Sequence, residues 1–372
     1  MMLQDLPTPC LVLDRPVLLR NLDAMAQAVG HHAGVALRPH MKTAKSIDVA
    51  RLVLSGQAVR AVGITVSTLA EAEYFCGHGI VDILYAVGIT PQKLDQIAKL
   101  NAAGGEVAVV TDDPDTASAI GVHPRPPRTL IEIDCGEGRG GIAADDPALL
   151  DIGTRLGGAL AGVMTHAGHS YAGRHPMAMR EIAEAERLAA VGAAGRLRAA
   201  GLECPIVSVG SSPTALYARS LEGVTETRPG VYMFGDLFQA AIATVPSDGI
   251  AVTVLASVIG RRPAERRLVI DAGAMALSKD RSTAATPNDC GFGLVLDIMG
   301  RPSLGRSLVG RANQEHGIVD LDPAAAMPEF KVGDKLRVAP NHACMTAAQH
   351  DRYFVTDGDD TVVAIWPRVS GW

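Results

Sequence analysis

Several short segments of this chain hold residue types that can take part in catalysis, and each follows an apolar run. Lys42 lies in RPHMKT, Arg139 in CGEGRGG, and His166 begins HAGHSY. Gly210 belongs to the turn SVGSS, and a second turn, RPGV, follows the next apolar run. A lysine amine can attack a carbonyl, arginine is a permanently charged donor, and backbone N–H groups in such turns can bind phosphate. Together these residues could hold a compound that carries both a carbonyl and a phosphate.

The elements that position these residues are indicated by apolar, β-branched runs that alternate with helical patterns. Helix start signals separate the runs: Thr68 and Glu71 have the spacing of a capping box, and Thr90 precedes a proline at a first helical position. The longest helix is expected over residues 175–200. Strands that alternate with helices predict a parallel sheet, and eight such units predict a closed (β/α)8 barrel. The eight runs lie at 35–38, 61–66, 83–87, 107–111, 130–134, 162–166, 206–210 and 224–227.

In a (β/α)8 barrel the active site lies at the carboxyl ends of the strands, where these segments fall. Two Gly-containing turns after the last two strands match the usual phosphate site of such barrels. With a lysine after the first strand, they predict bound pyridoxal 5′-phosphate and Lys42 as its covalent partner. Plain structural explanations remain open. Lysines are mostly solvated, Lys45 is an equal candidate by composition, residues 136–141 can be a tight turn, and His166 can be a core histidine.

The pattern changes after residue 236, where strand-like runs alternate with Gly, Asp and Asn turns. This predicts a barrel domain over 1–245 and an all-β domain over 246–372, with the extreme N-terminal strand able to pair with the β domain. His342 and Cys344 are two residues apart, which would put both side chains on one face of a strand. A nitrogen with a soft sulfur favours zinc over magnesium or manganese, and two protein ligands would leave an open site.

Composition excludes several classes of function. The chain has 372 residues, a formal net charge of −6, 48 % hydrophobic residues and only 4 % aromatic residues. A mildly acidic chain without Lys/Arg blocks does not fit a nucleic-acid or membrane surface, and so few aromatic residues provide no stacking platform for bases. The sequence has no signal-peptide pattern and no apolar run long enough to span a membrane. Six scattered cysteines are expected to be reduced thiols, and the protein is expected in the cytoplasm.

The residues around Lys42 resemble the lysine motif of fold-type III pyridoxal-phosphate enzymes, which have an alanine-racemase-like barrel. Within that group the chain is similar to the D-serine dehydratase and D-threonine aldolase family. The matching stretches cover both expected domains: LPTP at 6–9, GITVSTLAEAE at 63–73, SVGSSPT at 208–214, ANQEHG at 312–317 and PNHAC at 340–344. The resemblance therefore implies an alanine-racemase-like (β/α)8 barrel followed by a C-terminal all-β domain.

The resemblance also implies a role for each matching residue. Lys42 would hold the cofactor and move the Cα proton, and Arg139 would hydrogen-bond the phenolic oxygen of the cofactor. His166 would stack on the pyridine ring, and Tyr171 would face the ring nitrogen. Phosphate would be bound, largely through backbone N–H groups, by Gly210, Ser211, Gly230 and Val231. The chain departs from amino-acid racemases in having a phenol rather than an arginine at the ring nitrogen and no evident second catalytic tyrosine.

The implied function is a pyridoxal-phosphate- and zinc-dependent dehydratase, an ammonia-lyase. It would convert a D-3-hydroxy amino acid, D-threo-3-hydroxyaspartate or D-serine, to a 2-oxo acid plus ammonia. His342 and Cys344 would bind the catalytic zinc, since dehydratases of this group carry His-x-Cys whereas the related aldolases tend to carry His-x-Asp with a harder ion. Mn²⁺ and Mg²⁺ rank below zinc.

Two alternatives are weighed against the dehydratase. The first is a metal-dependent D-threonine aldolase, which cleaves Cα–Cβ. The second is a non-catalytic carrier of pyridoxal phosphate, which would need Lys42 and the phosphate turns but neither the metal pair nor the β domain. The expected partners are a small-molecule D-amino acid and a second copy of this chain, in a homodimer.

Overall fold

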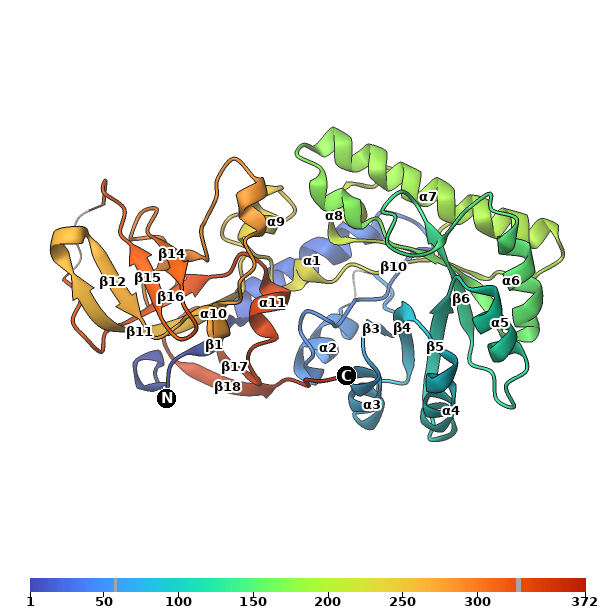
Figure 1. The fold of residues 1–372 in the computed structure, drawn as a ribbon, viewed down its shortest axis with the longest axis horizontal. Coiled ribbons are helices and arrows are strands. Elements are labelled where there is room, and N and C mark those ends of the chain that lie inside the picture. Colours follow the sequence, from blue (N-terminus) through green and yellow to red (C-terminus); the bar gives the residue numbers. More distant parts are fainter. Residues whose placement is uncertain (57–58, 326–328) are drawn as a thin grey trace. The chain divides into compact units, whose positions relative to one another are not determined.

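The computed structural model describes residues 1–56, 59–325 and 329–372, which form two compact units (Figure 1). The barrel unit comprises Asp23–Gly230 and Val369–Trp372, and the β unit comprises Met1–Leu22 and Val231–Arg368. The units therefore divide the chain earlier than the predicted boundary at 245/246. The N-terminal residues fall in the β unit because strand β1 (Cys10–Asp14) pairs there with two later strands.

Eight parallel strands form the sheet of the barrel unit, in the order β2-β10-β9-β8-β6-β5-β4-β3. Bridges from Leu37 to Ala61 and from His40 to Thr65 join the two ends of this order, so the strands close into a barrel. The strands are β2 (Ala36–Leu37), β3 (Ile64–Val66), β4 (Asp82–Gly88), β5 (Glu106–Thr111), β6 (Thr129–Asp134), β8 (Leu160–Thr165), β9 (Ile206–Val209) and β10 (Glu226–Thr227), with the short β7 (Ile142–Ala143) beside β6. The predicted (β/α)8 barrel is confirmed.

Helices connect the barrel strands, as the alternating pattern predicts. They are α1 (Arg15–Gly30, which begins in the β unit), α2 (Ile47–Leu54), α3 (Leu69–Gly77), α4 (Leu94–Ala102), α5 (Pro114–Gly121), α6 (Ala148–Leu156), α7 (Pro176–Ala199) and α8 (Ser212–Tyr217). At the start of α3 the Thr68 hydroxyl accepts a hydrogen bond from the Glu71 N–H at 3.0 Å, which satisfies a backbone donor of the first turn. Helix α7 is the long helix expected over 175–200.

The β unit contains a nine-stranded sheet in the order β12-β15-β14-β13-β16-β11-β1-β17-β18, in which β12 also pairs with β11. Its pairs are antiparallel except for β1 with β17. Its other strands are β11 (Val252–Arg262), β12 (Arg267–Ile270), β13 (Leu294–Leu296), β14 (Leu308–Ala312), β15 (Gly317–Asp320), β16 (Lys335–Ala339), β17 (Arg352–Thr356) and β18 (Val362–Pro367), and its helices are α9 (Leu237–Ala241), α10 (Ala274–Leu277) and α11 (Ala343–Ala347).

Two further findings bear on the sequence-based expectations. None of the helices in the described ranges is long and apolar enough to cross a lipid bilayer. All six cysteines lie within the described residues and none of them forms a disulfide, which agrees with the expected reduced thiols.

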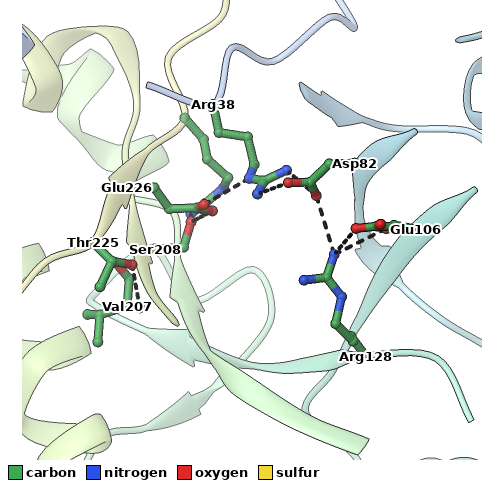
Figure 2. Close-up of polar contacts among 9 residues, drawn as sticks. Arg38, Asp82, Glu106, Arg128, Val207, Ser208, Thr225 and Glu226 are labelled. Atoms are coloured by element: carbon green, nitrogen blue, oxygen red, sulfur yellow. Dashed lines mark hydrogen bonds and ion pairs between the residues drawn. The ribbon is translucent and has the colours of Figure 1, made fainter. Parts of the chain in front are cut away.

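A chain of polar side chains, most of them buried, links strands of the barrel (Figure 2). The Arg38 guanidinium donates to Glu226 at 2.8 Å and, through its two terminal nitrogens, to Asp82 at 3.0 and 3.1 Å. The side chains of Arg38 and Glu226 are each only 6 % exposed. The Ser208 hydroxyl donates to the second Glu226 oxygen at 2.6 Å and accepts from Arg228 at 2.5 Å. Five charged or polar residues on four strands and their extensions are thus joined inside the barrel.

We predict that Arg38→Met lowers the free energy of unfolding by about 3–5 kcal/mol, because Glu226 would stay buried without its cation. Arg128→Met is the matched control: Arg128 also pairs with Asp82, at 3.4 Å, but is 47 % exposed, so its loss should cost about 0–1 kcal/mol. Urea unfolding followed by circular dichroism measures both. Equal losses for the two variants would contradict the importance of the buried pair.

Candidate active site

A cavity of about 470 Å³ lies at the carboxyl ends of the barrel strands. This volume is in the range of small-molecule sites. Each of the eight strands supplies at least one lining residue, either near its carboxyl end or just beyond it. These are His40 and Lys42 after β2, Ser67 after β3, Ala86, Val87 and Gly88 on β4, Asp112 after β5, Glu132, Arg139 and Gly140 on and after β6, Met164 and His166 on and after β8, Gly210 after β9, and Arg228 after β10.

The structure separates the two candidate lysines. Lys42 is exposed and lines the cavity, and its amine forms no ion pair with the described residues. The Lys45 amine instead lies 3.2 Å from the carboxylate of Glu71, whose side chain is completely buried. Removing Lys45 from that pair would strand a buried charge, so Lys45 has a structural explanation that Lys42 lacks. The geometry therefore favours Lys42 as the reactive amine.

Two histidines, His40 and His166, line the cavity, and both are neutral. Burial, followed by the positive charge of Lys42, lowers the pKa of His166 to about 3. Its Nδ1 lies 2.9 Å from the carbonyl oxygen of Gly210, which can only accept, so Nδ1 carries the proton and Nε2 is bare. Burial also lowers the pKa of His40 well below its usual range. Both rings are thus uncharged beside the cations of the cavity.

Arg139 lies in a loop that one carboxylate organises. A single oxygen of Asp134 accepts hydrogen bonds from the N–H groups of Gly136, Glu137 and Gly138, at 2.9, 3.0 and 3.1 Å. Burial opposes ionisation of this carboxyl, but the three donors outweigh it and lower the pKa of Asp134. Arg139 is 3.7 Å from Glu137 and 4.0 Å from Glu132. Its half-exposed guanidinium is therefore presented to the cavity from a fixed turn.

Two buried residues that the sequence analysis missed hold the backbone around the cavity. On α7, one carboxylate oxygen of Glu186 accepts the N–H groups of Ala167 at 2.9 Å and Gly210 at 3.0 Å. Arg228 lines the cavity and donates to the Thr165 carbonyl at 2.5 Å. A signal for Glu186 was present, because it falls on the buried stripe of α7: Met179, Ala183, Glu186, Ala190, Ala193, Ala194 and Leu197. A charged residue on such a stripe indicates a specific internal partner.

Of the predicted cofactor residues, four line this cavity: Lys42, Arg139, His166 and Gly210. Tyr171, in the short helix η4 (Gly168–Ala172), is half-buried but is not among the lining residues. Ser211 caps α8, with its hydroxyl accepting the Thr214 N–H at 3.2 Å, and Gly230 packs against the carbonyl of His40. Val231 belongs to the β unit, in the short helix η5 (Val231–Met233). Their roles stay predictions.

His342 and Cys344 also belong to the β unit, and the strand geometry expected for them is wrong. Strand β16 ends at Ala339, His342 precedes the first turn of α11, and Cys344 lies in that turn. The segment ACMTA has two alanines, the best helix former, and it forms helix rather than strand. The two side chains are nevertheless hydrogen-bonded to each other, as residues at the start of a helix can be.

The surroundings of this pair are negatively charged. His342 Nδ1 lies 3.1 Å from a carboxylate oxygen of Asp280. Burial lowers the pKa of His342, but the hydrogen bonds to Asp280 and Cys344 and the charges of Cys344 and Asp236 outweigh it and raise the pKa to about 11. Among the described residues no three His, Cys, Asp or Glu side chains are grouped to hold one metal ion. The pair therefore offers two donors, a nitrogen and a sulfur, in a site that favours positive charge.

Comparisons with known proteins match the chain over both units. The model described as "Alanine racemase, N-terminal domain" matches residues 13–237, and the model "Putative serine dehydratase domain" matches residues 251–356. The chain is 45 % identical to D-threo-3-hydroxyaspartate dehydratase of Delftia sp. (strain HT23), over 100 % of this chain and 99 % of that protein. It is 30 % identical to D-serine dehydratase of Schizosaccharomyces pombe (100 % and 93 %) and 32 % identical to D-threonine aldolase of Arthrobacter sp. (96 % and 91 %).

Solved structures agree with these matches. The Delftia sp. HT23 enzyme superimposes with a TM-score of 0.93 at 43 % identity, with all of both chains covered. A cysteine-to-alanine mutant of D-threo-3-hydroxyaspartate dehydratase in a metal-free form gives a TM-score of 0.94 at the same identity and coverage. The chain belongs to the D-serine dehydratase and D-threonine aldolase family. The family predicted from the sequence is thereby confirmed, and the protein is a lyase of the fold-type III, pyridoxal-phosphate-dependent group.

The cavity fits the cofactor of the family. Gly210 has φ +128°, and a Cβ there would lie 2.6 Å from the Thr227 hydroxyl, so only glycine leaves this turn open. Gly230 is buried, and its N–H makes no hydrogen bond to any described residue. A buried backbone donor without a partner suits a phosphate oxygen. The cations of Lys42, Arg139 and Arg228 outnumber the carboxylates of Asp112 and Glu132, which also suits an anionic cofactor.

We predict that Glu186→Ala weakens binding of pyridoxal phosphate and lowers the free energy of unfolding by about 1–3 kcal/mol, because the Ala167 and Gly210 N–H groups lose their buried acceptor. Glu186→Gln keeps an oxygen acceptor and should lose less. The control is Glu184→Ala on the same helix, whose carboxylate is half-exposed and, among the described residues, pairs with Arg187 alone. Absorbance titration with the cofactor and thermal unfolding measure the effects. A Glu186→Ala variant that binds cofactor as well as the Glu184→Ala variant would contradict this role.

Proposed function

We propose that this protein is a pyridoxal-phosphate- and zinc-dependent dehydratase of D-3-hydroxy amino acids. It would convert its substrate to a 2-oxo acid and ammonia, with no net oxidation or reduction. The observation that carries the proposal is the cavity at the barrel strands. Lys42, whose amine forms no ion pair with the described residues, lines this cavity together with the neutral His166 and with Arg139, which a fixed loop presents. Family membership supplies the class of reaction.

The residues of the cavity would hold and use the cofactor as follows. When bound, pyridoxal phosphate withdraws electron density from the Cα of the substrate and makes its proton acidic. Lys42 supplies the amine that attaches the cofactor and, once released, the base that removes the Cα proton. Arg139 would donate to the phenolic oxygen of the cofactor. His166 would lie against the ring and, being neutral, would add no charge that competes with the base.

The phosphate is assigned to the turns that follow β9 and β10. Gly210, Ser211, Gly230 and Val231 would surround the phosphate, with Gly230 and Val231 as its backbone N–H donors, because the Ser211 N–H already donates to the Thr214 hydroxyl at 3.0 Å. Glu186 holds the Gly210 N–H at 3.0 Å, so Glu186 fixes this turn rather than touching the cofactor. Tyr171 is assigned to the ring nitrogen on the strength of the family resemblance.

Loss of the β-hydroxyl needs an acid, and His342 with Cys344 is the donor pair assigned to it. A bound zinc ion supplies Lewis acidity to a departing hydroxyl without a proton donor of matched pKa. The neutral imidazole nitrogen and the thiolate are ligands that zinc prefers. Asp280 would orient the His342 ring through Nδ1 and leave Nε2 for the metal, an arrangement common around zinc-bound histidines. The metal-free form solved for a related dehydratase is consistent with a metal in the family.

The substrate is proposed to be D-threo-3-hydroxyaspartate, which the 45 % identical relative is named for, with D-serine as the smaller alternative. A homodimer in the cytoplasm is part of the same proposal. The competing activity is retro-aldol cleavage, because a D-threonine aldolase is 32 % identical over nearly the whole chain. Cys344 favours dehydration, since a soft sulfur at this position selects zinc rather than the harder ions of the aldolases.

Lys42 can be tested against Lys45 with matched substitutions. Lys42→Arg and Lys45→Arg each remove a primary amine and keep the positive charge, which preserves the pair with Glu71 in the second variant. After incubation with pyridoxal phosphate and reduction by borohydride, peptide mapping should find the label on Lys42 in the wild type and in Lys45→Arg. Lys42→Arg should carry no label and form no 2-oxo acid. Label on Lys45 in the wild type would refute the assignment.

The metal assignment is tested by chelation, with 2-oxo acid and aldehyde products measured separately. We expect chelation to stop formation of 2-oxo acid from D-threo-3-hydroxyaspartate and zinc to restore it better than Mn²⁺ or Mg²⁺, while bound cofactor is retained. Cys344→Ser should lose bound zinc in elemental analysis, whereas Cys290→Ser, another partly buried thiol of the β unit, should keep it. Full activity in protein shown to be metal-free would refute the zinc mechanism, and an aldehyde product would assign the protein to the aldolases.

A further inference from the structure

A second cavity, of about 290 Å³, lies wholly within the β unit and has no part in the proposed reaction. It is bounded by residues of β1, the start of α1, α9, β11, β13 and β16. Most of its wall is apolar: Val17, Leu237, Ile250, Leu294, Leu296 and Met299 contribute side chains. Such walls favour a ligand with a hydrocarbon body over water.

One arginine supplies the charge of this cavity. Arg337 on β16 lines it and is only 3 % exposed. Its Nε donates to the Thr253 hydroxyl at 2.6 Å. Within residues 1–56, 59–325 and 329–372, its two terminal nitrogens meet no acceptor and no carboxylate lies within ion-pair distance. A buried guanidinium normally has such a partner, because leaving its donors unsatisfied is costly.

The carboxylates nearest to Arg337 are engaged elsewhere. Asp14 and Asp297 are close enough to act on the charge of Arg337, although burial still lowers the pKa of the guanidinium to about 10, so it is protonated at neutral pH. Asp14 accepts the Val17 N–H at 3.1 Å. Asp297 accepts the Arg301 N–H at 2.9 Å and the Ser303 hydroxyl at 2.7 Å. These carboxylates therefore cap backbone and hydroxyl groups, and the terminal nitrogens of Arg337 stay available to the cavity.

A glycine keeps the space around the guanidinium open. Gly300 lines the cavity with φ +77°, and a Cβ at this position would lie 2.8 Å from a terminal nitrogen of Arg337. Any other residue would both strain the backbone and press on the arginine. Gly300 thus leaves space next to the terminal nitrogens of Arg337, which have no acceptor among the described residues.

We infer that this cavity binds a small monocarboxylic acid with an apolar body. The planar fork of Arg337 matches a carboxylate with two parallel hydrogen bonds, and the apolar wall takes the hydrocarbon part. Asp14 and Asp248 also line the cavity, so a second negative charge on the ligand would be repelled. The site therefore selects one carboxylate and excludes dicarboxylates and phosphates. It is separate from the cofactor residues of the barrel unit and does not depend on the proposed dehydratase activity.

The probe for this site is 3-methylbutanoate, compared with the neutral 3-methylbutan-1-ol and the dicarboxylate methylsuccinate. Ligand-observed NMR on the cofactor-loaded protein should detect the monocarboxylate and give much weaker binding for the other two. Arg337→Met should weaken binding of 3-methylbutanoate by at least about tenfold, since the fork is lost. Ala240→Phe, which fills the cavity from α9 and keeps Arg337, should do the same and covers the case in which Arg337→Met fails to fold.

A control separates this site from the cationic cavity of the barrel. Arg139→Met should leave the binding of 3-methylbutanoate unchanged, because Arg139 belongs to the other unit. The inference is overturned by any of three results: no binding to the wild type, equal binding of the alcohol, or unchanged binding of 3-methylbutanoate in a folded Arg337→Met or in Ala240→Phe.

Discussion

The barrel contains a buried ion pair, Arg38 with Glu226, on which the arrangement of its strands depends. Arg38 and Glu226 are taken almost entirely out of water, and such a pair is tolerated only if every donor and acceptor is used. Asp82 takes the far side of the guanidinium, and Ser208 takes the second oxygen of Glu226. Because these residues come from different strands, the polar requirement fixes the strands relative to one another more strictly than apolar contacts among Leu84, Val110 and Leu130 could do.

The same constraint reaches the active site. The Ser208 hydroxyl accepts a hydrogen bond from Arg228, and Arg228 also donates to the carbonyl of Thr165, the residue before His166. Arg228 thus connects the ion-pair network to the cavity that it lines. From the outer side, Glu186 holds the backbone of Ala167 and Gly210, and the Gly210 carbonyl in turn orients His166. The proposed cofactor contacts are therefore placed by buried residues that need not touch the cofactor. This is how loops after strands can hold a ligand in one geometry.

The barrel and its active-site rim were predictable because their signals are local. Alternating apolar runs, caps such as Thr68 and glycine turns such as Gly210 each express a short-range preference. Lys42 and Lys45 could not be separated, because what distinguishes them is the buried Glu71, which meets only Lys45 after folding. Glu186 and Arg228 act through residues about 20 or more positions away. The His342 and Cys344 pair was found by type, but its helical geometry depends on the segment that follows β16.

The two candidate sites have opposite electrostatics, and this divides the chemistry between the units. In the barrel cavity, burial and then the charge of Lys42 lower the pKa of both His40 and His166, so the imidazoles stay neutral and the positive charge of the cavity lies on its lysine and arginines. In the β unit, Asp280, Cys344 and Asp236 raise the pKa of His342. The His342 ring therefore keeps its proton, and with it a positive charge, at neutral pH. A divalent metal ion bound there, as proposed, would take the place of that proton, since metal binding releases the proton from its ligand. Under the proposed function, the cationic cavity of the barrel unit would bind the anionic cofactor, and the His342 and Cys344 pair would bind the metal ion that assists loss of the hydroxyl.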